Sequence, residues 1–235
     1  MRTLLAFPTA FGVRSPSPFV WKAMLLLDMA GLDYEVTIAN PVRAPKGKLP
    51  VLVDDGKVIP DSSFIRRHIE ARYGIDPDDG LEAGQRAQAQ ALVALIEDRL
   101  YWALVFSRWF EPHNAPRVRD AFFGALPLPL RRAVFALVRR RVRAQLRGHG
   151  IGRHSRDEIY LIGREALDAV AASLGGRAFL MGNRPSATDA TAYPMLASIL
   201  IPALASPLQD HLRTRPELLA YCDRCRRALE SEGQR

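Results

Sequence analysis

The chain has 235 residues, of which 48% are hydrophobic and 25% charged, so it is long enough for one large or two small globular domains. This composition excludes a disordered, collagen-like or disulfide-stapled chain, since Cys222 and Cys225 are the only cysteines. Pro8 breaks the N-terminal apolar run, so no signal peptide is expected, and a cytoplasmic location fits the two cysteines. The net charge is +8, yet residues 1–80 are neutral, with ten basic and ten acidic residues, so the excess lies further on.

The first eighty residues predict a small α/β unit. Strands are expected at residues 3–7, 34–38, 49–53 and 57–59, the last two joined by a turn at "DDG" (54–56). Helices are expected from Pro18 to about residue 30, and from residues 61–63 to Tyr73, where Gly74 ends the helix. The order strand–helix–strand, then strand–strand–helix, is typical of a thioredoxin-like domain.

The remainder predicts an all-helical domain of about five helices, after a linker with the sequence "GIDPDDGLEAG" (74–84). We place the two domains at residues 1–75 and 84–235. One helix is expected at 81–110, a second stretch from Arg117 that breaks at "PLPL" (127–130) and resumes at 131–146, and others at 155–174, 186–200 and 216–229. Ser155 with Glu158, and Ser186 with Asp189, form two capping boxes.

Residues 190–209 contain no charge and match a membrane span in length. Pro194, Pro202 and Pro207 interrupt this stretch, and a proline in a helix interior ends or kinks the helix. The sequence therefore favours a buried core helix in a soluble protein.

Basic residues gather in one segment, because residues 131–156 hold nine arginines and no acidic residue. Within 131–147, Val134, Val138 and Val142 share one stripe, with arginines on the other faces. Such a helix is either a solvated surface helix, which is the reading we favour, or one that contacts an anionic membrane surface weakly. No nucleic-acid partner is expected, because the arginines lack interleaved aromatic residues.

The sequence predicts no metal site. Cys222 and Cys225 form a single C-x-x-C on one face of the last helix, without a second pair or nearby histidines, which favours two partly buried thiols.

Several segments together resemble the glutathione transferase superfamily over nearly the whole chain. They are "SPFVWK" (17–22), "KLPVLVDDGKVIPDSSFIRRHIE" (48–70) and "FLMGNRPSATDATAYPML" (179–196). "GHGIGRHSRDEI" (148–159) resembles the branch that includes metaxins and failed-axon-connections-like proteins. The resemblance implies glutathione as co-substrate and a homodimer.

Ser17 matches the family position that faces the glutathione sulfur, with Ser15 as the alternative. Ser17 precedes Pro18 at the start of a helix, where exposed N–H groups and the helix dipole favour an anion. A hydroxyl there can donate a hydrogen bond to a thiolate and lower the pKa of the thiol. The plainer interpretation is that Ser17 only caps the helix. A serine, unlike a cysteine, forms no mixed disulfide, which disfavours glutaredoxin-like chemistry.

The resemblance also assigns the rest of the glutathione site. Leu49 and Pro50 match a cis-proline loop that pairs with the cysteinyl unit, and Asp61 with Ser62 matches the turn that receives the γ-glutamyl group. Lys46 and Lys48 are candidates for pairing with the glycyl carboxylate.

The expected chemistry is attack of the thiolate on an apolar electrophile, held near Tyr101, Trp102 and Trp109 of the helical domain. The alternative is a non-catalytic binding or scaffold protein on the same fold, because fold does not dictate function.

Overall fold

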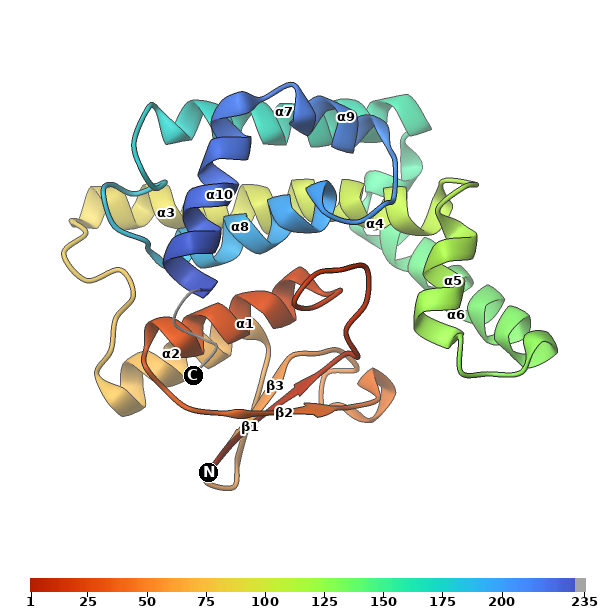
Figure 1. Cartoon of the computed structure of the whole chain (residues 1–235), viewed down its shortest axis with the longest axis horizontal. Helices are drawn as coiled ribbons and strands as arrows, with labels where there is room; N and C mark the ends of the chain where they lie inside the picture. The colour runs from red at the N-terminus through yellow and green to blue at the C-terminus, as the bar shows by residue number, and fades with distance from the viewer. Residues whose placement is uncertain (231–235) are drawn as a thin grey trace.

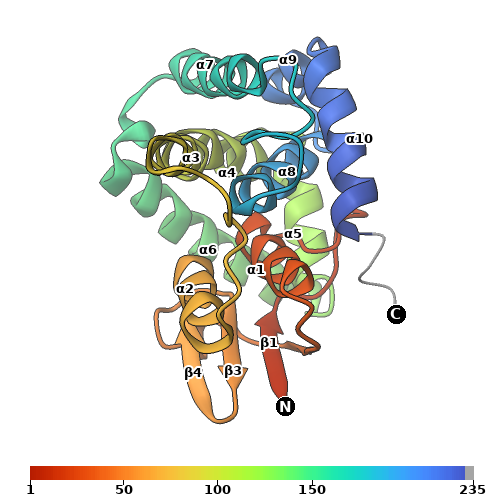
Figure 2. The ribbon, with the colours of Figure 1, turned by 90° about the vertical axis from the view of Figure 1, so that its left-hand side faces the viewer.

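The computed structural model describes residues 1–230, and residues 231–235, at the end of the second predicted domain, lie outside the described residues. Four strands form one sheet in the order β2-β1-β3-β4 (Figures 1 and 2). They are β1 (Arg2–Ala6), β2 (Glu35–Ile38), β3 (Val51–Asp54) and β4 (Lys57–Pro60). β1 pairs in parallel with β2, across a helical crossover, and antiparallel with β3. The predicted strands are therefore confirmed.

Two helices cover one face of this sheet, α1 (Pro18–Met29) and α2 (Ser62–Tyr73). α1 buries most of its length, including Val20, Trp21 and Leu25. α2 ends at Gly74, whose φ of 67° is left-handed, a conformation that glycine adopts without a Cβ penalty. A 3-10 turn, η1 (Pro41–Arg43), follows β2. The arrangement is the thioredoxin-like fold that the sequence predicts.

The rest of the chain is helical. Its elements are α3 (Ala83–Leu95), η2 (Ile96–Leu100), α4 (Tyr101–Phe110), α5 (Ala115–Phe123), α6 (Leu128–His149), η3 (Ile151–Arg153), α7 (Arg156–Leu174), α8 (Ala187–Leu200), α9 (Pro207–Arg213) and α10 (Pro216–Glu230). The division into domains at residues 75 and 84 stays a prediction.

Three details of the helical prediction were wrong. The long helix at 81–110 is interrupted by the π-helical turn η2, in which the Tyr101 N–H bonds to the Ile96 carbonyl. α6 starts at Leu128, inside the predicted break, because Pro129 lies in the first turn, where its missing N–H costs no helical bond. α9 was not predicted; Ser206 caps it by accepting a hydrogen bond from the Gln209 N–H.

α8 lies at the centre of the molecule, against α1 and α10 (Figure 1). Its residues from Ala187 to Ile199 are all buried, which confirms the predicted core helix. Trp21 of α1 packs edge-on against Tyr193 of α8, with ring centroids 5.4 Å apart. Among residues 1–230, no single helix is both long and apolar enough to cross a membrane, and only α5 and α6, bent by 114°, meet that test as a pair.

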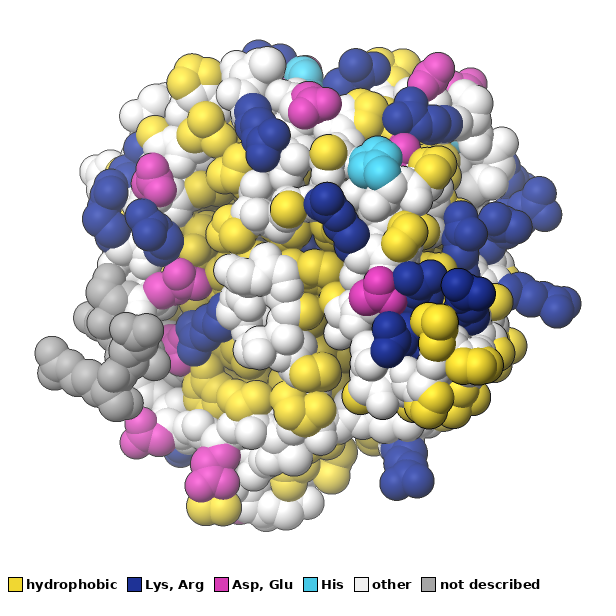
Figure 3. Space-filling model, turned by 45° about the vertical axis from the view of Figure 1, so that its right-hand side comes forward, with side chains coloured by type: hydrophobic (Ala, Val, Ile, Leu, Met, Phe, Trp, Pro, Cys, Tyr) yellow, Lys and Arg dark blue, Asp and Glu magenta, His cyan; other side chains and the backbone are white. Residues whose placement is uncertain are grey.

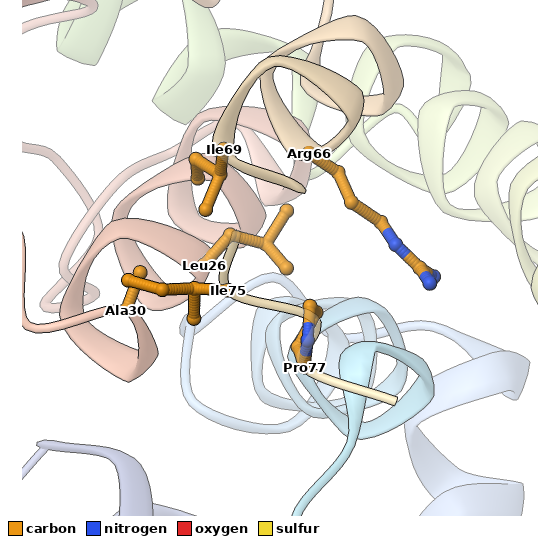
Figure 4. A pocket seen from close by; sticks show the side chains of 6 residues that line it. All are labelled: Leu26, Ala30, Arg66, Ile69, Ile75 and Pro77. Carbon is orange, nitrogen blue, oxygen red and sulfur yellow. The ribbon is translucent and has the colours of Figure 1, made fainter. Parts of the chain in front are cut away.

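The predicted linker is anchored at Asp78, which is 3% exposed. One oxygen of its carboxylate accepts from the Ala187 N–H at the start of α8, at 2.9 Å, and the other accepts from Arg66 of α2, at 2.8 Å. A cavity of about 10 Å³ lies beside it, between α1, α2 and Pro77 (Figure 4). A space of that size holds at most one water, so it is no ligand site.

α5 and α6 form a bent pair, which we call the hairpin (residues 115–149), at one end of the molecule (Figure 1). The stripe of Val134, Val138 and Val142 is half-buried and faces the protein. Trp109 of α4 stacks on Phe135 of α6 with centroids 5.7 Å apart, and Arg139 donates to the Trp109 carbonyl at 3.0 Å. Of the three valines, Val142 packs against the hydrophobic core.

Candidate functional site

One edge of the sheet brings together three loops that carry the predicted site residues. Leu5 of β1 pairs with Val51 of β3, and Val51 pairs with Pro60 of β4. Because neighbouring strands run in opposite directions, the loop after β1 (7–17), the loop before β3 (44–50) and the turn after β4 (61–62) leave at the same edge. The N-terminus of α1 follows the first of these loops.

Ser17 is the N-cap of α1, and its Oγ accepts from the Val20 N–H at 3.4 Å. Pro18 occupies the first helical position, so the capping prediction is confirmed. Ser17 is partly exposed, whereas Ser15 is 1% exposed and its Oγ accepts from the Ser17 N–H at 3.2 Å. A ligand at the start of α1 can therefore reach the hydroxyl of Ser17 more readily than that of Ser15.

The Leu49–Pro50 peptide bond is cis, as the resemblance implies. Both residues are buried, and the Pro50 carbonyl accepts from the Asp61 N–H at 3.0 Å, which ties this loop to the turn after β4. Asp61 has a φ of 91°, outside the range that a non-glycine residue prefers. Its side chain caps α2 by accepting from the Ser63 N–H at 3.0 Å, and Ser62 beside it is 2% exposed.

The two predicted lysines have different partners. Lys48 forms an ion pair with Asp61 at 2.9 Å, and the Lys46 Nζ lies over the ring of Phe64, 4.1 Å from its centroid. Burial alone would raise the pKa of Asp61, but hydrogen bonds from Lys48 and the Ser63 N–H hold that pKa below its ordinary value. Gly47 lies between the lysines, and the guanidinium of Arg141 from α6 is 3.7 Å from where a Cβ on Gly47 would lie. Three cations therefore gather at this loop.

Arg108 of α4 is a residue of this site that sequence reasoning missed. It is 6% exposed and donates to the carbonyl of Pro16, directly before Ser17, at 2.6 Å, and to the carbonyl of Ser198 in α8, at 2.8 Å. Its Nε has no partner, and within residues 1–230 no carboxylate pairs with it. Burial lowers the pKa of the guanidinium to about 10, so it stays charged at neutral pH. The sequence contains one indication of its burial: Arg108 follows Leu104 by four residues and so lies on the apolar face of the helix.

Aromatic side chains line the approach to the loop after β1. Phe122 of α5 lies edge-on to Phe11 and Phe7, at 5.7 and 6.3 Å, and stacks on Trp109 at 6.1 Å. The predicted group of Tyr101, Trp102 and Trp109 does not share one set of neighbours. Tyr101 contacts Phe19 of α1, at 4.7 Å, and Trp102 stacks on His149 of α6, at 4.8 Å. Trp109 therefore packs against the hairpin, through Phe122 and Phe135, whereas Tyr101 packs against Phe19 of α1.

The two cysteines lie away from this edge, in α10. Both are unpaired and buried, and burial raises the pKa of the Cys222 thiol to about 12. In the described part of the chain, no group of three or more His, Cys, Asp or Glu side chains is placed to hold a metal ion.

Two family models match this chain: the glutathione S-transferase N-terminal domain over residues 18–114 and the glutathione S-transferase C-terminal domain over residues 163–225. The whole hairpin (residues 115–149) lies between the two matches.

Among curated proteins, the chain is 29% identical to isoprene-epoxide–glutathione S-transferase of Rhodococcus sp., over 98% of this chain and 100% of that protein. It is 30% identical to Failed axon connections of Drosophila melanogaster, over 89% of this chain and 53% of that protein. It is 32% identical to metaxin-1 of Mus musculus, over 78% of this chain and 61% of that protein. The chain thus spans little more than half the length of the last two relatives.

Solved structures share the fold over almost the whole chain. Glutathione S-transferase III in its apo form superimposes with a TM-score of 0.63 at 20% identity, covering 99% of this chain and 95% of that one. Rice GST1 in complex with glutathione superimposes with a TM-score of 0.59 at 17% identity, covering 96% of this chain and 86% of that one.

Proposed function

Because the chain belongs to the glutathione S-transferase superfamily, in its metaxin-like branch, we propose that it binds glutathione at the sheet edge and transfers it to an apolar electrophile. The observation that carries this proposal is the partly exposed hydroxyl of Ser17 at the N-terminus of α1, beside the loops of Pro50 and Asp61. Members of this fold bind glutathione, and the rice neighbour holds it.

In the proposed mechanism, the thiol proton of glutathione passes to solvent and the hydroxyl of Ser17 donates a hydrogen bond to the thiolate. The helix N-terminus favours the same negative charge. The thiolate lone pair forms a carbon–sulfur bond to the electrophile, and the electrons of the broken bond move to the leaving atom. A free cysteine thiol has a pKa of about 8.5, so lowering that value increases the reactive fraction at neutral pH.

The other predicted residues take binding roles. Backbone groups of Leu49, before the cis peptide bond, pair with the cysteinyl unit, and Asp61 with Ser62 receives the γ-glutamyl group at the start of α2. Lys46 and Lys48 attract the glycyl carboxylate. The aromatic side chains of Phe11, Phe122 and Trp109 favour an apolar electrophile.

We include a homodimer and a cytoplasmic location in the proposal. Proteins of this fold often form dimers, and two free thiols fit a reducing compartment.

The competing function is a non-catalytic binding or scaffold protein, which the similarity to metaxin-1 and Failed axon connections favours. Calorimetric titration with reduced glutathione and S-hexylglutathione separates the two, because a transferase binds at one site per chain in the micromolar to millimolar range. Absence of heat and of a thermal shift with both ligands would move the assignment to the scaffold.

Turnover of Ser17→Ala then tests the mechanism. Loss of a hydrogen bond to a charged group predicts a fall of about 10- to 100-fold in conjugation, whereas Ser15→Ala should change it less. Thermal unfolding is the control, because loss of the cap costs only about 1 kcal/mol. Unchanged turnover in Ser17→Ala would remove this residue from the mechanism.

A further inference from the structure

α6 carries a second apolar stripe, beside that of the half-buried valines. At 100° per residue, Leu130, Ala133 and Leu137 share one side of the helix, and all three are exposed. Leu137 is 69% exposed and Leu130 is 50% exposed. No part of residues 1–230 covers this stripe, which continues from the uncharged sequence "AFFGALPLPL" (121–130) at the bend of the hairpin.

Arginines border the same stripe. Arg140 and Arg141 follow Leu137 by three and four residues and are exposed. Neither forms an ion pair within the described residues, whereas Arg131 and Arg156 pair with Asp120 and Glu111. Residues 121–156 contain no acidic side chain that could neutralise them.

We propose that the hairpin binds the surface of an anionic lipid membrane, with Leu130, Ala133 and Leu137 in the boundary between headgroups and acyl chains. Arg140 and Arg141 would then pair with lipid phosphates and carboxylates. This inference does not depend on the proposed transferase function.

Charge and apolarity together select this partner. A nucleic acid would use the arginines but leave the exposed leucines in water, whereas a lipid surface takes up both. A second copy of the same face would place arginines against arginines. The hairpin also lies at one end of the molecule, and hydrophobic and basic side chains adjoin one another where Figure 3 brings that end forward.

The test is cosedimentation of the full chain with vesicles of phosphatidylcholine alone, or containing about one third phosphatidylserine. We expect binding to the anionic vesicles at low salt and its loss at high salt, because salt screens the arginines. Each arginine near such a surface contributes about a fivefold factor, so the double variant Arg140→Gln, Arg141→Gln should bind about 25-fold more weakly. Leu130→Gln with Leu137→Gln should also weaken binding at least tenfold.

Matched controls change the same residue types elsewhere. Leu161 and Ile201 are 49% and 46% exposed, and Arg99 and Arg213 are exposed, all outside the hairpin. Leu161→Gln with Ile201→Gln, and Arg99→Gln with Arg213→Gln, should retain binding. Equal binding to neutral vesicles, no binding to either kind, or equal losses in the controls and the hairpin variants would overturn the proposal. Analytical sedimentation without vesicles tests the other occupant. If the parent chain is a dimer and only the hairpin variants are monomers, the face binds a second copy of the chain instead.

Discussion

Arg108 places a buried positive charge beside the loop that leads into α1. Its guanidinium is buried, has no acidic partner among residues 1–230, and binds the carbonyl of the residue before Ser17. An uncompensated buried cation is costly, and it lowers the free energy of a negative charge nearby more than an exposed one does. In the transferase mechanism, that negative charge is the glutathione thiolate.

We expect Arg108→Met to raise the pKa of bound glutathione by about one unit, because the positive charge behind the loop is lost. The ultraviolet absorbance of the thiolate, followed against pH, measures this shift. Arg108→Lys should keep most of the effect, and Arg99→Met, an exposed change in η2, should have none. An unchanged pKa in a folded Arg108→Met variant would leave Arg108 with a structural role alone.

The family resemblance pointed to Ser17, Pro50 and Asp61, and the structure brings their loops to one edge. Sequence reasoning missed Arg108 because a charged residue in an apolar helical face does not reveal what it will contact in a distant loop. The approach of the Arg141 guanidinium to the loop at Gly47 could not be read from the sequence for the same reason.

At the scale of elements, the two capping boxes have the same sequence pattern but different surroundings. Glu158 at the start of α7 is exposed, whereas Asp189 at the start of α8 is fully buried. Asp189 accepts four hydrogen bonds, from the Leu180 N–H, the Ser186 N–H and hydroxyl, and the Tyr221 hydroxyl. The sequence predicts both caps, but burial depends on tertiary packing, which periodicity does not show.

We therefore expect Asp189→Ala to lower the free energy of unfolding by about 3 kcal/mol or more, since it leaves several buried donors unpaired. Glu158→Ala should cost only about 0.5–1 kcal/mol. Urea denaturation of both variants provides the comparison. Similar losses would show that burial adds nothing to the cap of α8.

At the scale of the molecule, the parts that the sequence predicts as separate are joined through buried polar groups. Asp78 connects α2 to α8, and Lys22 of α1, 4% exposed, pairs with Glu97 of η2 at 2.7 Å. Glycine, proline and aspartate in the segment 74–84 predict irregular backbone, which residues 74–82 have, and α3 begins at Ala83. That composition did not reveal Asp78 as an anchor, because its partners are far away in sequence.

Asp78→Ala should accordingly destabilise the whole chain by about 2–4 kcal/mol, with a single unfolding transition. The matched variant Asp79→Ala changes an exposed neighbour and should stay within about 0.5 kcal/mol of the parent. Thermal unfolding monitored by circular dichroism distinguishes the two. Two separated transitions in the parent chain would contradict this coupling.

Glu111 holds the two ends of the hairpin together, which affects how freely the length of the hairpin can change. It is 3% exposed and accepts from both Arg156 and Tyr160 at 2.8 Å, so the chain returns after the hairpin to the point where it left. Lengthening a loop whose ends are already held together adds little closure entropy. We therefore expect that the hairpin can be lengthened or shortened while α4 and α7 keep their positions, and it lies in the segment between the two family-model matches.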